Sequence, residues 1–389
     1  MPTVVTAAKL WDGAHLLDHP ILTVEDGRIL SLTTRATAEA SSTPNTLDFP
    51  AATLAPSFFD IHIHGASDHD VMEATPAALD FIGRFLASHG TGAYLATTVT
   101  APVDSTLRAL SALARLLNHP AEDAPLARPI GVHLEGPFLS HLKRGVHPPE
   151  HLQPADIALF DRFYDAAEGH VCLMTLAPEL PGAPELTAHA TQRGVRVSVG
   201  HSNATAAETR AVIAAGASSA THTFNAMRPL DHREPGILGV VLTDDSLFAE
   251  LICDGVHNTA EMVKIWWRSK GPERAILITD AMRAAGMPDG EYTLAGYKVQ
   301  VLAGKASFGD VLAGSVLTLD KALTNFLAFT GASVQQGLRL LTANPAKMTG
   351  FSQQTGSLRI GGPANLIAVD EAGKLVASIV NGNGALPLQ

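Results

Sequence analysis

The sequence is poor in cysteine, in charged residues and in long apolar runs, and each shortage excludes a class of protein. Its 389 residues include only 2 cysteines, Cys172 and Cys253, both in apolar strand-like segments. This pattern is typical of buried free thiols, so we expect a reducing compartment, by default the cytoplasm. No apolar run approaches the roughly 18 residues that a membrane span needs, and the first ten residues do not resemble a secretory signal.

Low-complexity tracts, collagen repeats and sustained heptads are also missing, which excludes disordered, collagen-like and coiled-coil chains. Charged residues make up 17% of the chain, and the formal net charge is −11. Because nucleic acids and anionic membranes select clustered Lys and Arg, this balance argues against both as partners. Neither a P-loop motif nor G-x-S-x-G occurs, so P-loop phosphoryl transfer and α/β-hydrolase chemistry have no support.

The two ends of the chain share a strand-rich character. Near the N-terminus, Asp26-Gly27 between β-prone runs predicts a hairpin, and residues 357–382 again contain short β-prone runs. Neither end is long enough to bury a core of this size alone. We therefore predict one small β-sandwich domain built from residues 1–54 and 355–389, with residues 55–354 as a separate unit.

The middle of the chain alternates apolar strand segments with amphipathic helical patterns. The candidate strands cover residues 58–64, 92–98, 129–135, 171–177, 195–201, 220–222, 248–254 and 275–280. The clearest helical patterns cover residues 76–90, 104–119, 155–169 and 258–271. Eight strands separated by helices favour a (β/α)8 TIM-like barrel. The alternative is a doubly wound open sheet, but no G-x-G-x-x-G follows the first strand.

Potential metal ligands and proton carriers stand at the ends of these predicted strands, and the chain has 17 His in all. The residues concerned are Asp60, His62, His64, His133, Glu135, His201, His222, Asp254, His257 and Asp280. In a barrel, the carboxyl ends of all strands open on one face, where the loops build the site. These side chains, far apart in sequence, should therefore converge.

Each of these residues also has a simpler interpretation. His62 and His64 could be a polar strand end, His201 a loop histidine, and Asp280 a helix cap. Glu135 is harder to dismiss, because an unpaired buried carboxylate is costly and usually finds a cation. Taken together, one carboxylate and two histidines at strand ends predict a divalent metal site of the catalytic type.

Such a site suits hydrolysis of an unactivated amide. A bound divalent metal lowers the pKa of a water from about 15.7 towards 7 and polarises a carbonyl oxygen. Asp280 beside that water could act as general base and then as general acid towards a leaving amine. Zinc fits His and carboxylate ligands, and iron, manganese or cobalt would also fit them.

Several short motifs give the chain a family resemblance. They are HLEGPF followed by KRGVH, then GHSNAT, THTFNAM, REPG, DGVHN, TDAM and LAGS. In this order, at these spacings, they resemble the N-acetylglucosamine-6-phosphate deacetylase family of the amidohydrolase superfamily. The resemblance covers nearly the whole chain and implies a barrel with a split β domain, deacetylation of an amino-sugar phosphate and a homodimer. Ser140 departs from the Asn that many members of that family carry there.

The resemblance also implies roles for individual residues. Glu135, His201 and His222 would hold the catalytic metal, and Asp280 would be the catalytic acid/base. His147 would contact the sugar or the acetyl carbonyl; Asn225, Ala226, Arg233 and His257 would bind the phosphate. The family supplies that arginine across the dimer interface. Because both histidines of the first-strand His-x-His motif, His62 and His64, are present, a second metal bridged by Glu135 is also implied.

Some alternatives remain open at this stage. No lysine occurs between Lys143 and Lys264, which disfavours superfamily branches that bridge two metals with a carbamylated lysine. We interpret Lys143 and Arg144 as solvated loop charges. Other candidate functions are deacetylation of the galacto epimer, hydrolysis of N-acyl amino acids, and a catalytically silent barrel that binds a sugar phosphate.

Overall fold

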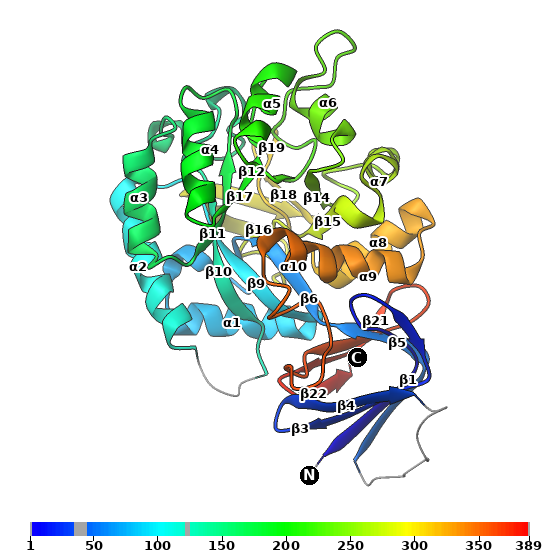
Figure 1. Cartoon of the computed structure of the whole chain (residues 1–389). Coiled ribbons are helices and arrows are strands. Elements are labelled where there is room, and N and C mark those ends of the chain that lie inside the picture. The colour runs from blue at the N-terminus through cyan, green and yellow to red at the C-terminus, as the bar shows by residue number, and fades with distance from the viewer. Residues whose placement is uncertain (1, 35–44, 121–124, 388–389) are drawn as a thin grey trace.

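The computed structural model describes residues 2–34, 45–120 and 125–387. A barrel surrounded by helices forms the larger part, and a twisted β-sheet that contains both ends of the chain lies below it (Figure 1). No helix in the described ranges is both long and apolar enough to cross a membrane. The thiols of Cys172 and Cys253 are both free.

Eight parallel strands form the barrel. In sheet order they are β6 (Phe58–Ile63), β9 (Thr91–Thr98), β10 (Arg128–Glu135), β11 (Val171–Leu176), β12 (Arg196–Val199), β13 (Ser219–Ala220), β14 (Phe248–Ile252) and β15 (Ala275–Ile278). Just beyond the strands, the Asp280 amide donates to the His62 carbonyl at 2.9 Å and the His64 amide donates to the Ala281 carbonyl at 2.8 Å. These bonds join the first strand to the last, and the predicted barrel is confirmed.

Helices cover the outside of the barrel (Figure 1). They are α1 (Pro76–Ser88), α2 (Val103–Asn118), α3 (Ile157–Ala166), α4 (Ala183–Gln192), α5 (Ala206–Ala214), α6 (Gly236–Thr243), α7 (Ala260–Arg274), α8 (Leu319–Thr330), α9 (Val334–Leu341) and α10 (Ala343–Thr349). A capping box of Thr205 and Glu208 begins α5. The inner faces of these helices and the barrel strands share one large hydrophobic core.

Strands from both ends of the chain pair in one second sheet. They are β1 (Thr3–Trp11), β2 (Leu16–Asp18), β3 (Pro20–Glu25), β4 (Arg28–Thr34), β5 (Thr46–Pro56), β20 (Leu366–Val369), β21 (Leu375–Val380) and β22 (Asn383–Pro387). Asp26 and Gly27, with φ of 49° and 72°, form the tight turn of the β3–β4 hairpin. The sheet has its own apolar core and fits the small β domain expected from both termini. The domain limits at residues 54 and 355 stay a prediction.

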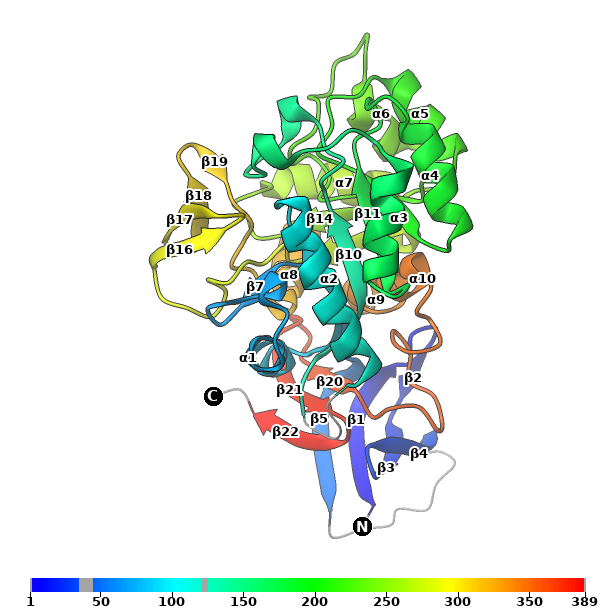
Figure 2. The same ribbon diagram turned by 90° about the vertical axis from the view of Figure 1, so that its left-hand side faces the viewer.

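An insertion between β15 and α8 was not expected from the sequence. It is a four-stranded antiparallel meander of β16 (Gly290–Leu294), β17 (Tyr297–Leu302), β18 (Lys305–Phe308) and β19 (Val311–Leu312). Figure 2 shows that it projects from one side of the barrel. Its apolar side chains form a small core with Val146 and Met282, which follow β10 and β15. The meander is thereby attached beside the carboxyl ends of the barrel strands.

Short elements complete the chain around this face. They are β7 (Gly65–Ala66), β8 (His69–Asp70) and the 3-10 turns η1 (Val71–Glu73), η2 (His141–Lys143) and η3 (Pro149–His151). The last two turns lie in the long loop after β10. This loop and the meander supply walls for the cavity described next.

Candidate active site

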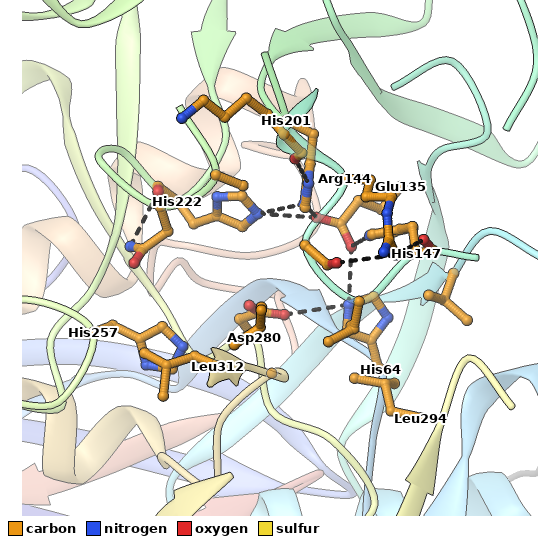
Figure 3. A pocket seen from close by; sticks show the side chains of 18 of the residues that line it. His64, Glu135, Arg144, His147, His201, His222, His257, Asp280, Leu294 and Leu312 are labelled. Carbon is orange, nitrogen blue, oxygen red and sulfur yellow. Dashed lines mark hydrogen bonds and ion pairs between the residues drawn. The ribbon is translucent and has the colours of Figure 1, made fainter. Parts of the chain in front are cut away.

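A cavity of about 480 Å³ opens at the carboxyl ends of the barrel strands. Its floor contains histidines and carboxylates from the first, third, fifth, sixth and eighth strands of the chain's barrel (Figure 3). The floor residues are His64, Glu135, His147, His201, His222 and Asp280. The structure therefore brings six of the ten predicted strand-end residues to this cavity, His257 being the sixth, while His147 comes from the loop after β10.

Glu135, at the end of β10, is the centre of this cluster. Its Oε1 lies 3.1 Å from Nε2 of His201 and 3.1 Å from Nε2 of His222. Its Oε2 lies 3.1 Å from Nε2 of His64 and 3.5 Å from Nε2 of His147. One carboxylate is thus shared between two groups of imidazoles, one on each of its oxygens.

A further cluster, formed by Asp280, His62 and His64, lies where the first and last barrel strands meet. Asp280 Oδ1 is 3.2 Å from Nε2 of His64 and 3.5 Å from Nε2 of His62. His62 is fully buried, and its Nε2 also lies 3.4 Å from Glu135 Oε1. Two sets of three side chains each place one potential ligand atom within 4.8 Å of the others: His62, His64 and Asp280, and Glu135, His147 and His201.

The backbone turns sharply at three of these residues. His201, His222 and Asp280 have φ of 45°, 27° and 50°, in the left-handed region that residues other than glycine avoid. Such backbone strain clusters at functional sites. In each case the turn comes directly after a barrel strand, so that the strand's last side chains face the cavity.

Hydrogen bonds to main-chain carbonyls orient two of the imidazoles. His201 Nδ1 lies 2.8 Å from the Lys143 carbonyl, and His64 Nδ1 lies 3.1 Å from the Thr97 carbonyl. Because a carbonyl oxygen only accepts, each Nδ1 carries the proton and donates. In the neutral rings each Nε2 then presents its lone pair to the cluster, as metal-binding histidines usually do.

Nearby positive charge stabilises the two buried carboxylates of the cluster, Glu135 and Asp280. Burial alone would raise the pKa of Glu135, but the charge of His62 and hydrogen bonds from His147, His201 and His222 hold that pKa well below its usual range. Burial opposes protonation of His64, yet its hydrogen bonds to Asp280 and Glu135 raise its pKa to about 10. Protons therefore gather between the two carboxylates, and a divalent cation would satisfy the same demand.

His147 behaves differently from the other imidazoles. It comes from the loop after β10, and its Nδ1 lies 2.8 Å from the Thr100 hydroxyl. Burial lowers its pKa to about 4, against the raising effect of Glu135. The ring is therefore neutral near pH 7, with one nitrogen tied to Thr100 and the other facing the cavity floor.

One buried carboxylate near the site was missed by the sequence analysis. Glu250, in the middle of β14, is fully buried, and its Oε2 lies 3.4 Å from His62 Nδ1. Its Oε1 has no hydrogen-bond partner within the described chain. The available signal was a single acidic residue inside the apolar run FAELI, where a carboxylate is costly unless it has a local partner.

A different set of polar groups lies on the other side of Asp280. His257 Nδ1 lies 2.6 Å from Asp254 Oδ2, which leaves the other ring nitrogen unengaged by that carboxylate. Asn225 and Ala226, in the loop after β13, line the same cavity. In Figure 3, His257 lies to one side of Asp280, and His147 and Leu294 lie to the other.

The structure separates the basic residues that the sequence analysis considered. Arg233 is exposed on the loop between β13 and α6, which projects from the barrel in Figure 1, and it is outside the set of described residues that line the cavity. Lys143 and Arg144 do line the cavity. For Arg144 our interpretation as a solvated loop charge needs correction, because its guanidinium donates to the carbonyls of Gly145 and His147; for Lys143 that interpretation stays a prediction.

Comparisons with known proteins agree with this geometry. The model of the amidohydrolase family matches residues 53–385. The chain is 41% identical to the N-acetylgalactosamine-6-phosphate deacetylase of Escherichia coli O157:H7, over 82% of this chain and 84% of that one. It is 36% identical to the N-acetylglucosamine-6-phosphate deacetylase of Bacillus subtilis, over 92% and 91% of the two chains.

A solved structure shares the whole architecture. The N-acetyl-D-glucosamine-6-phosphate deacetylase of Mycobacterium smegmatis superposes with a TM-score of 0.90 at 34% identity, covering 98% of both chains. The family match over most of the chain, the identities above 30% and the shared fold lead to one conclusion. This chain belongs to the amidohydrolase family.

Proposed function

We propose that the chain hydrolyses the acetamide of N-acetylglucosamine-6-phosphate to give glucosamine-6-phosphate and acetate. The observation that carries this proposal is that one cavity holds two different groups of residues. The buried cluster around Glu135 lies in one part of it, and Asn225, Ala226 and His257 line another part. The reacting amide and the phosphate of one small substrate would thus have separate binding groups. The relatives named above, which act on amino-sugar phosphates, support the same assignment.

A divalent metal is the cofactor that the cluster fits. We infer that Glu135, His201 and His222 would hold the first ion, and that His62 and His64, together with Glu135, would hold another. Imidazole and carboxylate donors suit zinc, which we place first; iron, manganese and cobalt are the alternatives. When bound, such an ion would supply an activated water and polarise the amide carbonyl.

Asp280 is the proposed acid/base. Its Oδ1 already lies 3.2 Å from His64 Nε2, at the edge of the Glu135 cluster. Although burial would raise its pKa, the charge of His62 and the hydrogen bond and charge of His64 hold that pKa below its usual range. A cation bound by His62 and His64 would supply the same positive charge, so the carboxylate starts ionised. It can therefore accept a proton from the attacking water and deliver it to the departing amine nitrogen.

The remaining polar residues would bind and orient the sugar phosphate. His147, neutral near pH 7, would contact the sugar or the acetyl carbonyl. Asn225, Ala226 and His257 would contact the phosphate, with Lys143 and Arg144 adding positive charge to the cavity wall. This local cationic region would act against the acidic protein's overall field.

We also propose that the active protein is a homodimer. Arg233 lies on an exposed loop outside its own cavity, where it could reach the phosphate site of a second copy. A guanidinium is suited to this because two of its five N–H groups can donate to one phosphate together. The two free cysteines support the further proposal of a reducing compartment such as the cytoplasm.

The galacto epimer is a second candidate substrate. It is favoured by the 41% identity to an N-acetylgalactosamine-6-phosphate deacetylase. The two sugars differ only at the 4-hydroxyl, so the same groups would bind the amide and the phosphate of both.

Acetate release tests the proposal directly. The purified protein is assayed with the gluco and galacto 6-phosphates, with N-acetylglucosamine lacking the phosphate and with a panel of N-acetyl amino acids. Each assay is run before and after chelation and after reloading with Zn²⁺. We expect release from a 6-phosphate that depends on metal and falls steeply without the phosphate. Turnover of N-acetyl amino acids with no turnover of either sugar phosphate would overturn it.

A further inference from the structure

A second cavity, of about 410 Å³, lies beside the first. Its walls come from the 3-10 turn η1, the start of α2, the loop after β10 and the β16–β17 turn of the meander. Val99 belongs to the lining of both cavities. It follows β9 directly and is 6% exposed, and as a member of both linings it separates the two spaces.

The wall that separates the two cavities, called the partition below, includes two other places in the chain. His147 lines the first cavity and its neighbour Pro148 lines the second; in the meander, Leu294 and Ala295 divide in the same way. At both places the partition includes backbone. Val99 is the residue that the two described linings share, so its side chain is the part of the partition that a substitution can remove.

The proposed substrate would meet this partition with its acyl end. In such a molecule the phosphate, the sugar ring, the amide carbonyl and the acetyl methyl follow one another in that order. If the phosphate lies at His257 and the carbonyl at the Glu135 cluster, the methyl continues away from His257. In Figure 3 that direction leads past Asp280 to the side where His147 and Leu294 lie.

We propose that Val99 is the residue that limits the acyl group to acetyl, by closing the catalytic cavity against the second one. This inference rests on the proposed function, because it takes the position of the methyl from the proposed binding of the phosphate. It extends that function by naming the residue that selects the acyl group and the space that a longer acyl group would enter.

The second cavity is suited to a short acyl chain. Apolar groups make up much of its lining, among them Met72, Ala101, Pro102 and Tyr297. Val99→Ala removes two methyl groups from the partition. The space that this opens is comparable to the one or two carbons by which propionyl or butyryl exceeds acetyl. Because one methylene in an apolar pocket is worth about 10–200-fold in specificity, the wild type should disfavour the N-propionyl substrate over the N-acetyl one by about that factor.

The test compares kcat/KM for the N-formyl, N-acetyl, N-propionyl and N-butyryl forms of the sugar phosphate. In Val99→Ala we expect the propionyl-to-acetyl ratio to rise at least about tenfold. Val311→Ala removes the same two methyl groups from the meander wall of the first cavity only, and Met72→Ala enlarges the second cavity only. Neither control should change the ratio.

A narrowing variant keeps the test decisive if Val99→Ala does not fold. Val99→Leu should instead lower kcat/KM for acetyl relative to formyl. An unchanged ratio in a folded Val99→Ala or Val99→Leu, or an equal rise in Val311→Ala, would overturn the inference while the wild-type activity leaves the proposed function standing. A wild type inactive on every N-acyl sugar phosphate would overturn both.

Discussion

Nε2 of His201 lies 3.1 Å from Nε2 of His222, and both atoms lie 3.1 Å from the same oxygen of Glu135. His201 Nδ1 donates to the Lys143 carbonyl, so its Nε2 is the ring nitrogen that faces Glu135 and His222. Nδ1 of His222 has no hydrogen-bond partner in the described chain. Nitrogen atoms converging on a carboxylate in this way form a site that a cation would stabilise.

Removal of metal should therefore cost both activity and stability. We expect a chelated, dialysed protein to lose acetate release and to melt at a lower temperature, since an ion present at a hundred times its Kd adds about 2.7 kcal/mol to the free energy of unfolding. Calorimetry and elemental analysis of the stripped and reloaded protein measure this. Full activity in a sample shown to be metal-free would contradict the proposed cofactor.

Asp280→Asn should separate catalysis from binding. The amide has nearly the same shape but cannot take or deliver the proton, so kcat should fall by about 10²–10⁴-fold. KM and metal content should change far less, because Glu135, His201 and His222 are untouched. Steady-state kinetics and elemental analysis decide the matter: a kcat within tenfold of wild type would remove Asp280 from the acid/base role.

The sequence predicted most of the framework of this site, for a physical reason. Barrel strands are buried runs between amphipathic helices, and their carboxyl ends meet on one face whatever the loops do. Glu135, His201, His222 and Asp280 could thus be expected to meet. His62 and His64 are confirmed as their neighbours, although the metal and substrate roles of all these residues remain proposals.

The parts that were missed depend on tertiary contacts. The β16–β19 meander consists of short strands that an alternation of strand and helix does not announce, and its place over the cavity is set by packing on Val146 and Met282. Arg144 looks like an ordinary loop charge in the sequence, and only the fold of the loop after β10 brings its guanidinium to the carbonyls of Gly145 and His147. Glu250 is hidden in an apolar strand, where only its burial beside His62 shows its importance.

Replacement of Glu250 should lower the affinity of the proposed second metal site, which includes His62 and His64. Glu250→Gln keeps the shape but removes the charge that faces His62 Nδ1, and loss of such an outer partner typically costs 10–100-fold in metal affinity. Chelator competition with a stepwise readout of metal stoichiometry measures the effect. Glu261→Gln, on the exposed first turn of α7, is the matched control. Equal affinities in both variants would assign Glu250 a packing role only.

The two free thiols predict instability in alkali. Burial raises the pKa of Cys172 to about 12, and burial with the nearby Asp254 charge raises the pKa of Cys253 further still. Above about pH 9 the unfolded chain loses these protons while the folded chain keeps them, so stability falls as pH rises through this window.

Melting temperatures between pH 8 and 11 should show this directly. The fall in Tm with pH should be smaller in Cys172→Ala/Cys253→Ala than in wild type, whatever the offset at pH 8. Val197→Ala, which truncates a fully buried side chain in β12, should shift Tm equally at every pH. Parallel pH profiles for wild type and the cysteine variant would rule the thiols out as the cause.

Mixing of two defective variants tests whether Arg233 serves a second copy. Arg233→Ala should raise KM strongly and change kcat less, because it would remove a phosphate contact and leave the Asp280 chemistry intact. Asp280→Asn should be nearly inactive. In a mixed dimer, the subunit with Arg233→Ala keeps its own Asp280 and receives an intact arginine from its partner, so one site of the two is restored.

Random re-association makes half of all dimers mixed, so about one quarter of the sites should regain wild-type kcat/KM, as expected for a two-fold symmetric assembly. The activity of the mixture should then exceed the mean of the two separate samples at low substrate concentration. A mixture that equals that mean, in a sample where exchange of subunits is shown with differently tagged chains, would mean that each Arg233 acts within its own subunit or not at all.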